Sequence, residues 1–65
     1  MTIGITKELI GKRIKMIEMV EDPNPIPNGT MGTIYNVGYD VLNVKWDNGR
    51  NLGVVVNVDN FEIID

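Results

Sequence analysis

The chain has 65 residues, a formal net charge of −3 and a pI of about 4.6, and it contains no Cys and no His. This composition excludes disulfides and leaves a transition metal without thiolate or imidazole ligands, and the negative charge disfavours attraction to the phosphate backbone of nucleic acids. A single domain over residues 1–65 buries only ~60% of its unfolded surface, so we expect a homo-oligomer to supplement the small core.

The segment that ends at Gly11 combines apolar residues with a helix-capping pattern. Thr6 is a candidate cap for a single helical turn that Gly11 ends. We expect Leu9 and Ile10 of this turn to fold onto the interior of the domain.

Residues 12–20 are predicted to form the first long strand. Ile14 and Met16 alternate with charged neighbours, and the alternation changes phase at Ile17 and Met19. Such a change of phase predicts a β-bulge or a strong bend. The cationic cluster of the chain lies here and consists of Lys12, Arg13 and Lys15. We interpret it as a solvent-exposed strand face, with a binding patch as the alternative.

Residues 21–29 contain all three prolines of the chain at alternate positions, which predicts a stiff, irregular loop that is the longest of the domain. Loops on a rigid scaffold often carry binding residues, and this one holds Glu21, Asp22, Asn24 and Asn28. Two interpretations stay open: these side chains bind a partner, or Asp22 and Asn28 cap turns through nearby backbone groups. Their spacing matches no EF-hand loop, so we predict no metal site.

Residues 30–37 are predicted to form the second strand, in which Gly32 permits tight curvature or a close backbone approach. Residues 35–40 then supply a loop or a wide hairpin. Residues 41–47 alternate cleanly between apolar and polar side chains, and Trp46 lies on the apolar face. We therefore expect Trp46 to point into the core.

Asn48 and Gly49 predict a two-residue type I′ hairpin turn, because both residue types tolerate positive φ. In the strand that follows, the apolar residue Val55 lies on the face that should be exposed to solvent. This indicates a surface for a partner or for self-association. Residues 61–64 are predicted to form a last strand that pairs with the first. These elements fit an all-β fold, a small five-stranded SH3-like barrel with a Pro-rich long loop and a short N-terminal helical turn.

Three motifs carry a family resemblance: Pro25-Ile26-Pro27-Asn28-Gly29-Thr30-Met31-Gly32-Thr33-Ile34, Val44-Lys45-Trp46-Asp47-Asn48-Gly49 and Val58-Asp59-Asn60-Phe61-Glu62-Ile63-Ile64. Together with residues 11–19 they resemble a family of small domains of unknown function that is common on phages and conjugative elements. The resemblance implies a mobile-element origin and carries over no catalytic residues. Residues 38–43 and 53–57 depart from the usual family pattern. The glycine and tryptophan motifs are more distantly similar to peptide-binding SH3-like domains of the Mind-bomb type in ubiquitin ligases.

The sequence offers no convincing pair of nucleophile and base, so we expect no enzymatic activity and no cofactor. The main hypothesis is a non-catalytic binding protein from a phage or mobile element that captures a host defence protein. The alternatives are a sponge for a small signalling nucleotide, a self-assembling structural domain and, disfavoured by acidity, a nucleic-acid-binding barrel. Because no apolar run reaches the length of a membrane span, we expect no membrane partner and a location in the host cytoplasm.

The expected docking groove lies between the Pro-rich loop and residues 35–40, with Tyr35 and Tyr39 as aromatic walls. In nucleotide capture the same tyrosines would stack a base, while Arg50, Lys12 or Arg13 would meet phosphate. The candidate partner-binding residues are Asp22, Asn24, Tyr35, Tyr39, Asp40 and Arg50, with Val55 as the candidate for self-association. A basic host factor would be attracted to the carboxylates of Asp22, Asp40, Asp59 and Asp65.

Overall fold

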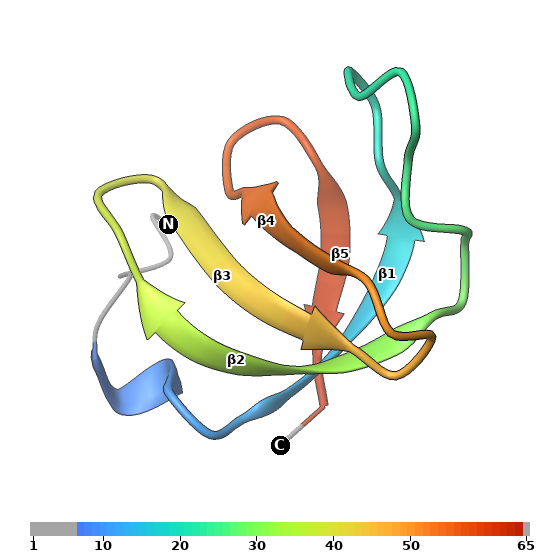
Figure 1. Ribbon diagram of the computed structural model, residues 1–65. Helices are drawn as coiled ribbons and strands as arrows, with labels where there is room; N and C mark the ends of the chain where they lie inside the picture. Colours follow the sequence, from blue (N-terminus) through green and yellow to red (C-terminus); the bar gives the residue numbers. More distant parts are fainter. Residues whose placement is uncertain (1–6, 65) are drawn as a thin grey trace.

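A computed structural model describes residues 7–64 and shows an antiparallel sheet of five strands preceded by one short 3-10 helix (Figure 1). The elements are η1 (Lys7–Leu9), β1 (Arg13–Glu18), β2 (Met31–Val37), β3 (Val41–Trp46), β4 (Asn51–Val55) and β5 (Asn60–Ile63). The predicted all-β class and the short N-terminal helical turn are confirmed. Thr6, the expected cap of that turn, lies outside the described residues.

The strand order is β4-β3-β2-β1-β5, so the last strand pairs with the first, as the sequence predicts. Figure 1 shows the sheet strongly bent around its interior, with β4 and β5 joined by a short connection at one end. Within residues 7–64 the ladder of paired strands ends at β4 on one side and at β5 on the other. Closure of the sheet into an SH3-like barrel therefore stays a prediction.

The predicted irregularity of the first strand is a β-bulge. Met16 pairs with Phe61 and Glu18 with Asn60, which leaves Ile17 as an extra residue on β1. The side chain of Ile17 is exposed, whereas Met19 is buried after the change of phase. The bulge thus turns the end of β1 so that Met19 points back into the interior.

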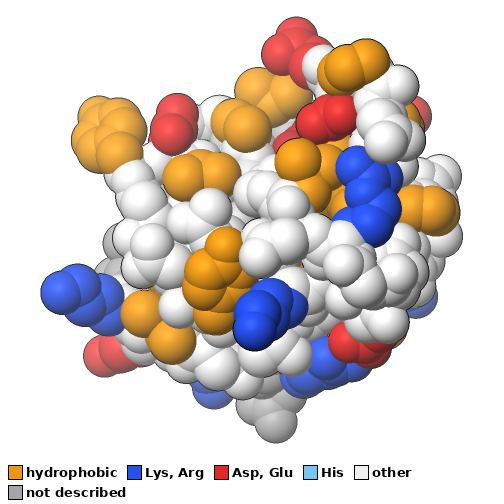
Figure 2. Space-filling model, viewed as in Figure 1, with side chains coloured by type: hydrophobic (Ala, Val, Ile, Leu, Met, Phe, Trp, Pro, Cys, Tyr) orange, Lys and Arg blue, Asp and Glu red, His pale blue; other side chains and the backbone are white. Residues whose placement is uncertain are grey.

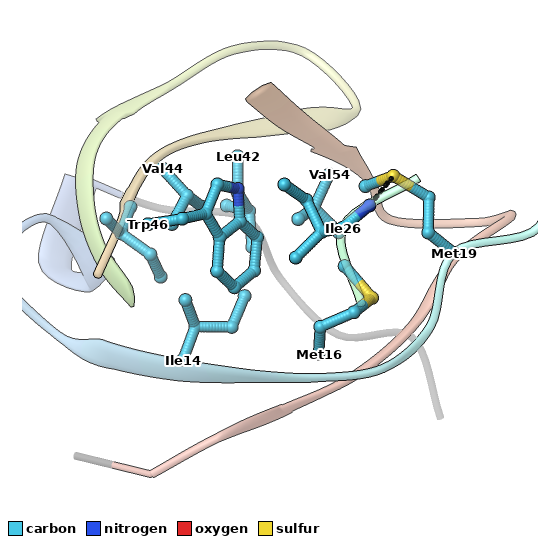
Figure 3. Packing of buried hydrophobic residues seen from close by; sticks show 9 residues of the cluster. Ile14, Met16, Met19, Ile26, Leu42, Val44, Trp46 and Val54 are labelled. Carbon is cyan, nitrogen blue, oxygen red and sulfur yellow. Dashed lines mark hydrogen bonds between the residues drawn. The ribbon is translucent and has the colours of Figure 1, made fainter. Parts of the chain in front are cut away.

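The core lies on the concave side of the sheet and centres on Trp46, which is 3% exposed, as the alternation of its strand predicts (Figure 3). The indole N–H of Trp46 donates a hydrogen bond of 2.9 Å to the carbonyl of Leu52, so the ring is buried with its polar atom satisfied. A Cβ on Gly32 would lie 2.6 Å from Val44 Cγ1 and 2.9 Å from Trp46 Cε3. Glycine is therefore required at position 32 for close packing of β2 against β3.

The Pro-rich loop also contributes to the core, which the sequence pattern did not predict. Ile26 is 1% exposed and its N–H lies 3.5 Å from the sulfur of Met19 (Figure 3). Leu9 packs against the same core, but Ile10 is 44% exposed, so the expectation that both would fold inward is wrong for Ile10. Leu9 and Ile10 are consecutive residues at the end of a single 3-10 turn, so their side chains point in different directions and only that of Leu9 faces the sheet.

The turn between β3 and β4 differs from the predicted type I′ hairpin. Gly49 has a φ of 92°, but no non-glycine residue within residues 7–64 has positive φ, so Asn48 does not adopt the conformation that a type I′ turn requires. Gly49 N–H donates to Trp46 O at 3.0 Å and Trp46 N–H donates to Arg50 O at 2.9 Å. The loop thus has one residue more than predicted, with glycine alone in the left-handed region.

Candidate functional site: an acid-rimmed hollow beside strand β4

A hollow of about 240 Å³ opens between the first part of the Pro-rich loop, the end of β4 and the β4–β5 connection. Figure 2 shows hydrophobic and acidic side chains next to one another at the end of the molecule that carries this loop and connection. The residues that line the hollow are Met19, Glu21, Asp22, Gly53, Val55, Val58 and Asp59.

Asp59 joins the two sides of this hollow. Its carboxylate accepts the N–H of Val20 at 3.1 Å and the N–H of Val55 at 2.9 Å, and the residue is only 8% exposed. Val20 follows β1 and Val55 ends β4, so one side chain links two segments that no strand pairing connects. Hydrogen bonds to a charged acceptor are stronger than those between neutral groups. Asp59 therefore fixes the separation of the walls of the hollow.

The walls of the hollow expose apolar surface. Val55 and Val58 are each 36% exposed, and Met19, which lines the same hollow, is 7% exposed. Val55 is thus apolar on a solvent-facing surface, as the sequence predicts. Partly exposed aliphatic side chains around a concave surface can be covered by an apolar group of another molecule.

The rim of the hollow is acidic because Glu21 and Asp22 enter it from the Pro-rich loop. Asp22 Oδ1 accepts the N–H of Asn24 at 2.8 Å, which confirms that Asp22 caps a local turn. A carboxylate has about four lone-pair sites, so this bond leaves it able to accept from a further donor. The turn-capping interpretation is thus confirmed for Asp22, and the partner-binding interpretation stays a prediction.

None of the residues that line the hollow is Lys or Arg, although the guanidinium of Arg50 reaches the neighbouring Pro-rich loop at the carbonyls of Asn24 and Pro25. All six Lys and Arg residues of the chain fall within residues 7–15 and 45–50. Five carboxylates belong to the end that carries the hollow: Glu18, Glu21, Asp22, Asp40 and Asp59. Asp40 belongs to this end because its carbonyl accepts the N–H of Val56 at 2.9 Å.

The two guanidinium groups predicted to meet phosphate are held by other parts of the protein. Arg50 donates to the carbonyls of Asn24 at 2.7 Å and Pro25 at 3.1 Å and so fastens the Pro-rich loop. Arg13 pairs with Asp47 through contacts of 2.6 and 3.1 Å. Hydrogen bonding within this exposed pair lowers the pKa of the Asp47 carboxyl and raises the pKa of Arg13.

The family described as "Domain of unknown function (DUF4314)" matches residues 8–64, which is nearly the whole chain. The chain belongs to the DUF4314 family. The predicted membership of a family of unknown function is thus confirmed. No match is found among curated proteins or among solved structures.

Of the residues predicted to bind a partner, the structure brings Asp22 to the hollow, and it places Val55 there as well. Tyr35 and Tyr39 do not line it: the hydroxyl of Tyr35 donates to Asn51 Oδ1 at 2.9 Å, and Tyr39 is 98% exposed. The hollow of this DUF4314 chain thus lies between the Pro-rich loop and the β4–β5 connection, whereas the groove was expected between the Pro-rich loop and residues 35–40.

Three lining residues were given no role in binding by the sequence: Met19, Gly53 and Val58. They come from three separate stretches of the chain, and only the bend of the sheet brings them together. The change of phase at Met19 was the available signal, because it indicates a strand end that turns toward another element.

The side chains that line the hollow supply carboxylates, aliphatic groups and the thioether of Met19. Among residues 7–64, no group of three Asp or Glu side chains is arranged to hold a metal ion. The same part of the chain contains no helix with the length and apolar character needed to cross a membrane. What the arrangement offers a ligand is apolar contact next to negative charge.

Proposed function

We propose that this DUF4314 chain is a non-catalytic binding protein that captures another protein, and that the hollow beside β4 is its docking site. The observation that carries the proposal is the lining of the hollow, where the partly exposed Val55 and Val58 lie next to the carboxylates of Glu21 and Asp22. A concave surface with apolar walls and a few polar groups is the usual form of a site that receives a side chain of a ligand.

The rigidity of the site supports capture of a partner without large rearrangement. Asp59 holds Val20 and Val55, while Arg50 fastens the Pro-rich loop by its backbone carbonyls. A preformed surface binds more tightly than one that must be ordered on contact, because less conformational entropy is lost. The carboxylates of the lining lack a neighbouring nucleophile and base pair, which supports binding over catalysis.

The mobile-element origin implied by the family resemblance makes a host protein the expected partner, in the cytoplasm of the host cell. The nucleotide sponge is less well supported, since Arg13 and Arg50 are both engaged within the protein. Self-association through Val55 stays a prediction, and it would use the same hollow. A second copy and a foreign partner would then compete for one site.

A display library of random peptides, selected on the immobilised protein, tests this proposal. Enriched peptides should shift the backbone amide signals of Val55, Val58 and Asp59 in ¹⁵N-correlated NMR spectra. The variant Val58→Lys should weaken binding at least tenfold, whereas Tyr39→Ser, at a fully solvated position outside the hollow, should leave it unchanged. Failure to enrich any peptide, or shifts confined to the signals of Tyr35 and Tyr39, would refute the proposed site.

A further inference from the structure

The geometry points to the chemical class of the group that enters the hollow: we infer that it is a Lys or Arg side chain of the partner protein. This inference rests on the proposed function and adds to it the charge and shape of the docked residue. The stem of the side chain would lie against the aliphatic walls, and its cationic head would reach the carboxylates of the rim.

The aliphatic walls fit the stem of such a side chain. Met19, Val55 and Val58 give the hollow, which has a volume of about 240 Å³, an apolar part of its lining. Lys and Arg commonly cover apolar surface with their methylene groups while the charged head stays in contact with water or with a counter-ion. A long side chain of this type displaces water from the walls without burying its charge.

The rim fits the head group. Glu21 is exposed and Asp22 half-buried, and both line the hollow from the same loop. Asp22 is held in place by its bond to the Asn24 N–H, so its carboxylate is already oriented before a partner arrives. A guanidinium group can bind carboxylate oxygens through two parallel hydrogen bonds, which favours Arg over Lys at such a rim.

The charge distribution of the whole chain favours the same occupant. No Lys or Arg is among the residues that line the hollow, and the guanidinium of Arg50, which reaches the Pro-rich loop, is engaged there by the carbonyls of Asn24 and Pro25. Complementary charge steers a cationic segment toward this end and repels an anionic one, and both effects weaken as salt is added. A neutral apolar side chain would fill the walls but leave the acidic rim without a counter-charge.

The peptides selected on the protein provide the test. Each Arg of an enriched peptide is replaced in turn by citrulline, which keeps the shape of the stem and removes the charge. One such exchange should lower affinity about tenfold or more, and the wild-type affinity should fall as salt rises from 50 to 500 mM.

A matched pair of protein variants completes the experiment. The double variant Glu21→Gln and Asp22→Asn should lose the preference for Arg over citrulline, because the amide of Asn keeps an acceptor for the Asn24 N–H while the charge is removed. The control variant, Glu8→Gln with Glu62→Gln, removes the same charge from exposed positions that do not line the hollow and should keep the preference.

Two outcomes separate this inference from the proposed function. Peptides that shift the signals of the hollow but bind equally well with citrulline would overturn the inference and leave the docking site in place. A library that yields no peptide at the hollow would overturn both.

Discussion

The two halves of the Pro-rich loop differ in what they contact. The second half is part of the folded interior: Ile26 is buried, and Gly29 N–H and Thr30 O bond to the backbone of Met16 at 2.6 and 2.8 Å. The first half supplies Glu21 and Asp22 to the rim of the hollow. One loop thus closes the core with its apolar residue and borders the proposed docking site with its charged residues.

This difference shows how a small domain can keep a preformed surface on a loop. The backbone of the second half is hydrogen-bonded to β1 and to Arg50, so the first half extends from a segment whose position is fixed. Binding residues on loops are useful when a rigid scaffold positions them. Substitutions in the two halves should therefore have separable effects, with stability lost in one and binding lost in the other.

The largest expected effect is that of Ile26→Ala, which empties a position that is 1% exposed. Truncating a buried isoleucine costs ~2–5 kcal/mol of unfolding free energy, a large share of the stability of so small a domain. Urea denaturation followed by Trp46 fluorescence measures the loss. The matched control is Ile17→Ala at the exposed bulge of β1, where the cost should stay below ~1 kcal/mol. Equal losses for the two variants would contradict the anchoring of the loop by its isoleucine.

An intermediate effect is expected for Asp59→Ala, which removes the link between the two walls of the hollow. The N–H groups of Val20 and Val55 would lose their shared acceptor, at a cost of ~1–3 kcal/mol for partly buried hydrogen bonds to a charged group. Hydrogen exchange at these two amides should accelerate more than exchange in β2 and β3. Asp59→Asn retains one carbonyl acceptor, so its exchange rates at these amides should lie between those of Asp59→Ala and those of the wild type. Unchanged exchange at both amides would show that the carboxylate does not hold the walls.

The smallest effect is expected at the Arg13–Asp47 pair, which lies away from both halves of the loop. The side chains are 39% and 55% exposed, so solvent and salt screen the pair. Because hydrogen bonding to Arg13 lowers the pKa of Asp47 in the folded state, the stabilising contribution is present above about pH 4 and is lost as pH falls through the folded value. As the pH is lowered, the melting temperature of Asp47→Asn should therefore fall slightly less steeply than that of the wild type. A steeper fall than in the wild type would reverse the assigned sign.

Local patterns predicted the strands of this fold well. The alternation of residues 41–47 placed Trp46 in the core, and the change of phase after Met16 indicated a bulge that the pairing of β1 with β5 contains. The turn at Gly49 was located correctly but given the wrong geometry, since the dipeptide Asn-Gly fits both the predicted type I′ turn and the longer loop that forms. Sequence pattern places a turn more reliably than it sets the number of residues in it.

The candidate site was harder to predict because it is a tertiary feature. Asp22 and Val55 were singled out separately, one for its loop and the other for its parity on a strand, and nothing in their spacing indicates that both line one hollow. Asp59 precedes the last strand by one residue and fits an ordinary turn residue equally well. Its bonds to Val20 and Val55 depend on how far the sheet bends, which no local pattern specifies.

The bond from Val55 N–H to Asp59 has a consequence for behaviour at high concentration. An outer strand with unpaired amide groups can recruit a strand from another chain and begin a growing fibril. At the end of β4 that amide already has an intramolecular acceptor, so lengthening of the sheet by a second molecule is blocked there. Concentrated solutions of this protein should accordingly resist strand addition at Val55, and we expect assembly at this end of β4 to proceed by contact between side chains.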